Sequence, residues 1–148
     1  MPTLQIKTKG HYDFIDLTDK ILELLKKTNI ESGLISVFVV GSTAALTIME
    51  YETGSLKDIK NVLEKWAPEK NDYEHHLKWG DNNGAAHIKS ALIGPDITIP
   101  INKNKIALGT WQRITLIDFD EKERAKPLNN PTLKDPCGLK LFIKFFSI

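Results

Sequence analysis

The chain has 148 residues, the length of one ordinary domain, and we expect residues 1–148 to fold as a single unit. It carries 20 Lys and Arg against 19 Asp and Glu, and this balance argues against a nucleic-acid partner, because phosphate binders concentrate positive charge. No apolar run reaches the roughly twenty residues of a membrane helix, and the first residues lack the apolar centre of a signal peptide, so we expect a cytoplasmic protein without a membrane partner.

In chain order, the alternation of apolar residues and the β-branched runs predict strands at 3–7, 11–17, 34–40, 44–49, 97–101, 106–108, 110–119 and 139–146. Helical spacing of apolar residues predicts helices at 18–29, 55–66 and 85–92. Thr18 and Ser55 are the predicted N-caps of the first two helices. The polar stretch 72–84 is predicted to be a loop, and 120–138 a long irregular connection.

Strands outnumber helices, and the order has no regular βαβ alternation. We therefore expect an α+β fold with a mixed, mostly antiparallel sheet and two main helices on one side. The run 34–40 is expected to be a central strand covered on both faces. Phe142 and Phe146 fall on the outer face of the last predicted strand, which indicates another layer or another subunit.

Histidines cluster in one short stretch, with His75, His76 and His87 close together in the sequence. If the chain is extended at 75 and 76, these two side chains point to opposite sides, so only one of them serves a given site. His75 and His87 can bind zinc or another divalent ion if Asp81 or Asn82 supplies an oxygen, or can act without metal as acid and base. The alternative is purely structural hydrogen bonding, because the spacing matches no tight ligand signature.

A second candidate segment comprises Gly109, Thr110, Trp111, Gln112 and Arg113. The glycine permits close backbone approach and Gln112 offers both a donor and an acceptor, as in the wall of a ligand site. The alternative is that Trp111 is an interior or interface anchor and Arg113 a solvated strand residue.

A third candidate is the bend at Gly41, Ser42 and Thr43, directly after a buried strand. Consecutive backbone N–H groups and small hydroxyls at such a position can hold an anion, and phosphate is the obvious one. The alternative is an ordinary strand bend, since no P-loop motif is present.

Taken together, the segments 41–50, 74–76, 86–95 and 108–114 resemble the YjbQ-like family, whose members are often labelled secondary thiamine-phosphate synthase. The resemblance covers nearly the whole chain. It implies an α+β homotrimer with pockets near the subunit contacts. It also implies an activity that joins hydroxymethylpyrimidine diphosphate to thiazole phosphate and releases pyrophosphate.

Under this resemblance His75 and His87 match the family's motif histidines, and together with Asp81 they are the expected catalytic residues. Departing pyrophosphate needs cationic or metal stabilisation, which Mg²⁺ or Zn²⁺ can supply. The expected substrate or phosphate contacts are Ser42, Thr43, Lys89, Gly109, Thr110, Trp111, Gln112 and Arg113.

Gly41 is a departure from the family pattern, because many relatives carry a histidine at this position. A metal ion would therefore depend on His75 and His87 with an oxygen ligand or water. Two other functions fit the same residues: a metal-assisted hydrolase, and a non-enzymatic trimer that binds a phosphorylated metabolite.

Overall fold

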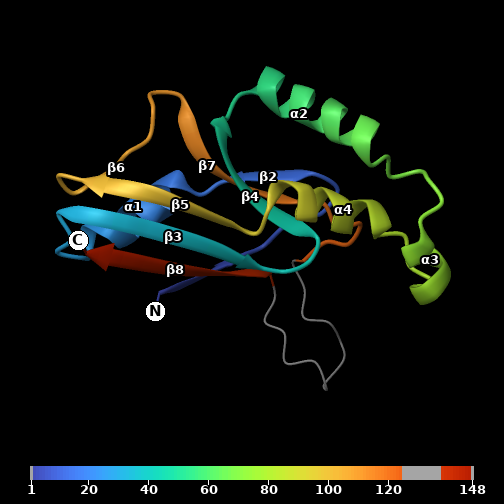
Figure 1. The fold of residues 1–148 in the computed structure, drawn as a ribbon, viewed down its shortest axis with the longest axis horizontal. Helices are drawn as coiled ribbons and strands as arrows, with labels where there is room; N and C mark the ends of the chain where they lie inside the picture. Colours follow the sequence, from blue (N-terminus) through green and yellow to red (C-terminus); the bar gives the residue numbers. More distant parts are fainter. Residues whose placement is uncertain (1, 125–137, 148) are drawn as a thin grey trace.

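The computed structural model describes residues 2–124 and 138–147, which contain eight strands and four helices (Figure 1). The strands are β1 Thr3–Ile6, β2 Asp13–Asp16, β3 Ser32–Val40, β4 Ala44–Glu50, β5 Asp96–Asn102, β6 Lys105–Ile106, β7 Gln112–Asp118 and β8 Leu139–Ser147. The helices are α1 Thr18–Lys26, α2 Thr53–Trp66, α3 Glu74–Trp79 and α4 Gly84–Ile93. No helix among these residues is both long and apolar enough to span a membrane.

The strands form two sheets, a five-stranded sheet A in the order β1-β8-β3-β5-β6 and a three-stranded sheet B in the order β2-β7-β4. Every strand pair in the described residues is antiparallel. The α+β class expected from the sequence is therefore confirmed. The link at Gly10 joins the two sheets, because β1 belongs to sheet A and β2 to sheet B.

The main hydrophobic core lies between the two sheets, where alternate residues of each strand face inward. Val37 and Ile143 come from sheet A, Leu46 and Leu116 from sheet B, and Ile21 from α1. Each of these side chains is buried almost completely, and such burial contributes roughly 1.5–3 kcal/mol per side chain. α1 thus belongs to the inner core.

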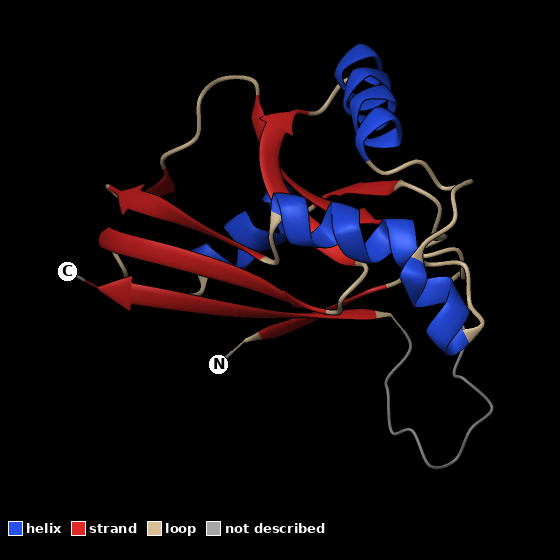
Figure 2. Cartoon of the chain, turned by 45° about the vertical axis from the view of Figure 1, so that its right-hand side comes forward, coloured by secondary structure: helices blue, strands red, loops and turns tan. Residues whose placement is uncertain are grey.

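A second, smaller core covers the other face of sheet B. Leu63 of α2 and Ala86 of α4 pack there with Tyr12, Ile117 and Phe119. Figure 1 shows the resulting order, with α2 at the top, β8 at the bottom, and β4 and β7 between them. Figure 2 shows α3 at the right-hand end of the molecule, next to α4, which runs from the middle of the molecule toward that end.

The helix starts differ from the sequence-based expectation. Thr18 does not cap α1, because its hydroxyl accepts the backbone N–H of Ile114 at 2.9 Å, while Asp16 Oδ1 accepts the backbone N–H of Thr18 at 2.8 Å. α2 starts two residues before Ser55, and the carboxylate of Glu52 accepts the first free N–H groups of this helix. A carboxylate favours the positive end of a helix dipole, so Glu52 is the better cap.

Two further expectations were wrong. The predicted loop 72–84 contains α3, which ends at Gly80 in the left-handed conformation (φ 68°). β3 is central in sheet A but is covered on one face only, since Phe38 and Val40 are 43% and 45% exposed. Most of the predicted connection 120–138 lies outside the described residues.

Candidate active site

His75 and His87 lie side by side, although eleven residues separate them in the sequence. His75 is on α3 and His87 is on α4, and the two helices, which are joined by the short link that begins at Gly80, are in contact. Their ring centroids are 4.5 Å apart at an interplanar angle of 60°. The structure therefore brings together the two histidines that the sequence singled out.

A backbone carbonyl orients the ring of His87. Its Nδ1 lies 3.0 Å from the carbonyl oxygen of Ser42, and a carbonyl can only accept a hydrogen bond, so Nδ1 carries the proton. In the neutral ring this leaves the lone pair on Nε2. The bend at Ser42 thus fixes the tautomer of His87 and leaves a nitrogen that can take a proton.

A carboxylate faces the ring of His75. The Nε2 atom of His75 is 3.3 Å from Asp81 Oδ1, and each side chain is 32% exposed. The two atoms are within ion-pair distance, yet Oδ1 is buried and forms no hydrogen bond with any described residue. Asp81 Oδ1 thus lies next to the ring of His75 without accepting a hydrogen bond from it.

His76 has a structural role instead. Its Nε2 accepts the backbone N–H of Gly84 at 3.1 Å, which ties α3 to the first turn of α4. A Cβ atom at Gly84 would lie 2.8 Å from Tyr73 Cβ and 3.0 Å from His76 Nε2, so only glycine permits this close approach. His75 and His76 thus make different contacts, and they do so on a helix rather than on the extended chain that the sequence led us to expect.

Lys89 was expected to contact phosphate, and the structure places it in the interior. Its side chain is 1% exposed, and Nζ is 2.5 Å from Glu64 Oε1 and 4.5 Å from the centroid of the Tyr12 ring. Burial alone raises the pKa of Glu64, but hydrogen bonds from Lys89 and Tyr12 outweigh it and hold that pKa below its ordinary value. A phosphate could reach Lys89 only if this pair opened.

Thr43 is also engaged by protein groups. It is buried, its hydroxyl donates to Asp120 Oδ2 at 3.0 Å, and it accepts a hydrogen bond from Arg124 Nη2. Arg124 in turn pairs with Asp120 at 2.9 Å and with the buried Asp118 at 3.2 Å. Ser42 is exposed next to this network, so it is the more accessible of the two predicted hydroxyls.

The segment Gly109–Arg113 lies away from the histidines within one chain. In sheet B, Ala44 pairs with Asp118 and Met49 with Arg113, so the start of β4 and the start of β7 are at opposite ends. Five residues of strand span about 17 Å. The histidines therefore do not reach this segment within a single chain.

The contacts of the Gly109–Arg113 segment are local. Arg113 Nε is 2.6 Å from Asp16 Oδ2, and Gln112 Oε1 accepts the backbone N–H of Gly109 at 2.8 Å. Thr110 and Trp111 are exposed, with 72% of Trp111 accessible. A large aromatic side chain held so far out of the core is typical of an interface anchor.

Sequence reasoning missed Arg124 and the pairing of Glu64 with Lys89. A signal for the second was available, because Lys89 comes four residues after Ala85 and so shares the apolar face of its helix. A lysine on a buried face requires an anionic partner. Arg124 follows an acidic stretch after β7, a pattern that gives no comparable signal.

The candidate site contains residue types that bind metal ions, but these side chains are not arranged around a common point. His75, His87 and Asp81 offer two nitrogens and an oxygen, which is a set that zinc accepts. Among residues 2–124 and 138–147, however, no three His, Cys, Asp or Glu side chains are arranged to hold a metal ion. We therefore derive no chemical step through a metal.

The fold and the site define a class of small α+β proteins with two antiparallel sheets and a histidine pair between two short helices. The family model described as UPF0047 protein YjbQ-like matches residues 2–131, and the chain belongs to this family. A UPF0047 protein of Archaeoglobus fulgidus is 38% identical over 117 residues, which span 79% of this chain and 89% of the relative. The UPF0047 protein YugU of Bacillus subtilis is 31% identical, with 81% and 89% covered.

Solved structures share the fold. A YjbQ/UPF0047 family protein from Clostridium acetobutylicum, described as uncharacterised, superposes with a TM-score of 0.79 at 29% identity and covers 99% of this chain and 100% of its own. A YbjQ-like protein of unknown function from Sulfolobus solfataricus has a TM-score of 0.84 at 23% identity, with 99% and 96% covered. These relatives establish the family and the architecture, and their names assign no reaction.

Proposed function

We propose that this protein is a small-molecule transferase that joins hydroxymethylpyrimidine diphosphate to thiazole phosphate. In this reaction the bond between the methylene carbon and the pyrophosphate oxygen breaks, and the oxygen keeps the electron pair. The thiazole nitrogen donates its lone pair to form the new C–N bond, and thiamine phosphate and pyrophosphate are released. The family resemblance motivates the choice of substrates.

The observation that carries the proposal is the pairing of His75 with His87, in which a backbone carbonyl orients the ring of His87. Asp81 lies against His75, and the carbonyl of Ser42 fixes His87. An imidazole whose other nitrogen is held in this way is ready to exchange a proton. In its protonated form, His87 would donate from Nε2 to the departing pyrophosphate oxygen and neutralise the charge that develops there.

Phosphate binding would use the bend that follows β3. Ser42 is exposed, and Arg124 Nη1 comes within 3.9 Å of a Cβ atom built on Gly41. Asp118 and Asp120 hold the guanidinium through its other nitrogens. Arg124 therefore joins Ser42 as the expected contact for an anionic group, in place of the buried Lys89.

We further propose that the chain works as a homotrimer. Sheet A exposes an apolar outer face, where Phe38, Val40 and Phe146 are 43%, 45% and 47% accessible. In a trimer, the Gly109–Arg113 segment of a neighbouring subunit could complete the histidine site that it does not reach within its own chain. The exposed Trp111 supports this arrangement.

The test is direct assay of thiamine phosphate formed from the two precursors with Mg²⁺ present. We expect His87→Ala to lower kcat by about 100-fold or more, since it removes a proton-transfer group. Glu74→Gln, at an exposed position on the same helix as His75, should retain the wild-type rate. A wild-type protein that binds both precursors and leaves them unchanged would instead support a non-enzymatic binding trimer.

A metal-assisted hydrolase is the second candidate, and the buried Asp81 Oδ1 without a hydrogen-bond donor favours it. A divalent ion could satisfy that oxygen if the rings of His75 and His87 rotated toward it. Elemental analysis of the purified protein separates the two candidates. One ion per chain that is lost in His75→Ala would support the hydrolase, and a fully active metal-free protein would refute it.

A further inference from the structure

α4 runs along the bend between β3 and β4 and forms hydrogen bonds with every second residue of that segment. The three pairs are His87 Nδ1 with the carbonyl of Ser42, Ser90 Oγ with the carbonyl of Ala44, and the carbonyl of Gly94 with the N–H of Leu46, at 3.0, 2.7 and 3.0 Å. The orientation of His87 is thus tied to the path of the chain at the bend. Thr43, which lies between the first two of these partners, makes its contacts with a different part of the molecule.

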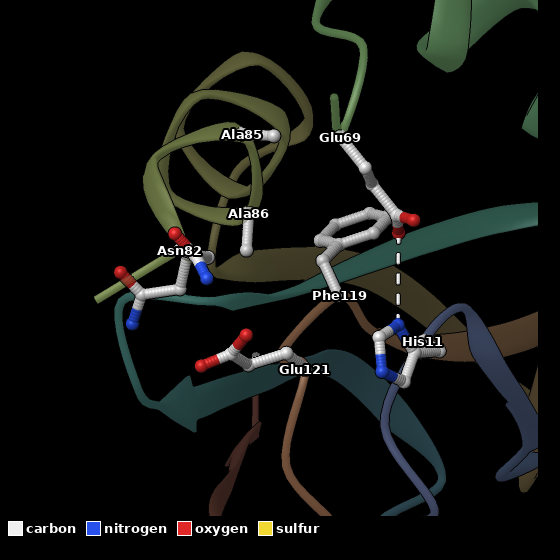
Figure 3. A pocket seen from close by; sticks show the side chains of 8 residues that line it. His11, Glu69, Asn82, Ala85, Ala86, Phe119 and Glu121 are labelled. Atoms are coloured by element: carbon white, nitrogen blue, oxygen red, sulfur yellow. Dashed lines mark ion pairs between the residues drawn. The ribbon is translucent and has the colours of Figure 1, made fainter. Parts of the chain in front are cut away.

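Thr43 forms hydrogen bonds with the residues that follow β7. Its carbonyl accepts the N–H of Phe119 at 2.9 Å, and its hydroxyl donates to Asp120 Oδ2 at 3.0 Å and accepts a hydrogen bond from Arg124 Nη2. Phe119 belongs to the same buried cluster as Ala86 of α4, and Figure 3 shows both side chains in the lining of a pocket of about 120 Å³. Only 3% of Thr43 is accessible, so solvent does not compete for its hydrogen bonds.

The two groups that hold the hydroxyl of Thr43 are themselves fixed. Arg124 Nη2 is 2.9 Å from Asp120 Oδ2, and Arg124 Nε is 3.2 Å from the fully buried carboxylate of Asp118. The backbone N–H of Arg124 donates to the carbonyl of Thr8 at 2.9 Å, and the hydroxyl of Thr8 donates to Asp118 Oδ2 at 2.5 Å. Opening this network would leave a buried carboxylate without its cation, so the network resists displacement.

The anchoring of Thr43 determines where the carbonyl of Ser42 points. This carbonyl belongs to the planar peptide unit that joins Ser42 to Thr43, so a fixed Thr43 restricts its direction. The side chain of Ser42 is exposed and adds little restraint of its own. A neutral histidine side chain in water carries its proton mostly on Nε2, and the Nδ1–H form of His87 therefore depends on this carbonyl.

We propose that Thr43 is a positioning residue for His87. Its hydroxyl, held by Asp120 and Arg124, keeps the carbonyl of Ser42 in place, and this carbonyl keeps the proton of the neutral ring on Nδ1. Nε2 is then the nitrogen that exchanges a proton. This catalytic consequence rests on the reaction proposed above, whereas the tautomer of His87 does not. Thr43 thereby acts through His87 and does not contact phosphate itself.

The ring ¹⁵N chemical shifts of His87 report which nitrogen carries the proton, and they require no substrate. They are measured on ¹⁵N-labelled protein at a pH where the ring is neutral, and their loss in His87→Ala assigns them. We expect the Nδ1–H form in the wild type. Thr43→Val removes the hydroxyl and keeps the shape of the side chain. In this variant the ratio of the Nε2–H form to the Nδ1–H form should rise about tenfold, which corresponds to the loss of one hydrogen bond.

Two matched variants test whether the hydroxyl of Thr43 is responsible. Thr43→Ser keeps the hydroxyl and should keep the wild-type ratio. Thr47→Val makes the same change farther along β4 and should also keep it. An equal rise in either of these variants would overturn the proposal, as would an unchanged ratio in a folded Thr43→Val or a wild-type ring protonated on Nε2. If Thr43→Val does not fold, Arg124→Gln replaces it, because it removes the hydrogen bond that Thr43 accepts, and an unchanged ratio there would also overturn the proposal.

The assay of thiamine phosphate separates this proposal from the reaction itself. If the wild type turns over, Thr43→Val should lower kcat about tenfold and leave KM for both precursors nearly unchanged, because it alters a tautomer and not a substrate contact. A higher KM at unchanged kcat would make Thr43 a substrate contact and overturn its positioning role. If the wild type forms no thiamine phosphate but the tautomer still shifts in Thr43→Val, the proposed reaction fails and the positioning of His87 stands.

Discussion

Lys89 places a charged group at a position that an apolar side chain would otherwise fill. Its ammonium contacts the carboxylate of Glu64 and the ring face of Tyr12. This contact joins α4, α2 and the residue that precedes β2. We expect Lys89→Met to lower the free energy of unfolding by about 1–2 kcal/mol, since it leaves the carboxylate of Glu64, which is 33% exposed, without its cation. Urea unfolding followed by circular dichroism measures this change.

Lys60 provides the matched control for Lys89. Its Nζ lies 5.0 Å from the centroid of the same Tyr12 ring, but the residue is exposed. Lys60→Met should therefore change the unfolding free energy by no more than about 0.5 kcal/mol. Equal losses in the two lysine variants would show that the pair with Glu64 contributes nothing of its own.

Asp16 and Asp118 are expected to respond to acid in opposite directions. Burial tends to raise the pKa of Asp16, but hydrogen bonds from Thr18 and Arg113 outweigh it, and the pKa lies below its ordinary value. Burial raises the pKa of Asp118, and the hydrogen bond from Thr8 offsets only part of the increase. The native state therefore releases the proton of Asp16 more readily than the unfolded chain does, and retains that of Asp118 more strongly.

The consequence for stability can be measured between pH 7 and pH 3. Asp16 contributes to the free energy of unfolding above about pH 4, and this contribution is lost on acidification. Asp16→Asn should therefore lower the free energy of unfolding by about 1–2 kcal/mol at neutral pH. In this variant the free energy of unfolding should also fall less steeply as the pH is lowered. Asp118 contributes to the free energy of unfolding below about pH 4, and this contribution is lost as the pH rises through the pKa of Asp118 in the folded protein. In Asp118→Asn the free energy of unfolding should therefore fall more steeply as the pH is lowered. Identical pH profiles for the two variants would contradict these directions.

At the scale of elements, the contact between α3 and α4 depends on Gly84. A methyl group there would lie 2.8 Å from Tyr73 Cβ, which is closer than two such atoms can approach. We expect Gly84→Ala to lower the unfolding free energy by about 1–3 kcal/mol and to separate His75 from His87. Chemical shifts of the two histidine rings report that separation, and Lys78→Ala, at an exposed position of α3, should leave the ring contact in place.

The sequence predicted most of the elements because their apolar patterns are local. The alternation in β5 and β8 and the helical spacing in α2 and α4 matched the structure within a few residues. α3 was missed because it is only six residues long and has no buried residue, so no apolar stripe marks it. The cap of α1 was misassigned because Thr18 bonds to the distant Ile114, a contact that the sequence does not reveal.

The sequence named several residues of the candidate site, but it did not indicate which partners orient them. The pairing of His75 with His87 could be anticipated from their loop, whereas the carbonyl of Ser42 that orients His87 comes from a strand end 45 residues away. The burial of Lys89 likewise depends on Glu64, 25 residues earlier. Such long-range partners follow from the packing of α2 and α4 on sheet B, which local patterns do not determine.

At the scale of the whole molecule, the candidate segments singled out in the sequence occupy two separate regions of one chain. Ser42, His75 and His87 gather at one end of sheet B, and Gly109–Arg113 begins β7 at the other. A single chain would then leave each region with half of a site. A closed trimer resolves this if its heterologous contacts bring the two ends of neighbouring subunits together.

Mixed trimers test this arrangement. His87→Ala and Trp111→Ala should each abolish turnover alone, because every site in either homotrimer lacks one component. If each site combines His87 of one subunit with Trp111 of its neighbour, unfolding and reassembling an equal mixture should leave about one quarter of the sites intact and restore activity in that proportion. If both residues act within the same chain, every site in the mixture keeps one defect and activity stays at zero. Light scattering on the same samples must report three chains per particle, and a monomer would remove the basis of the shared site.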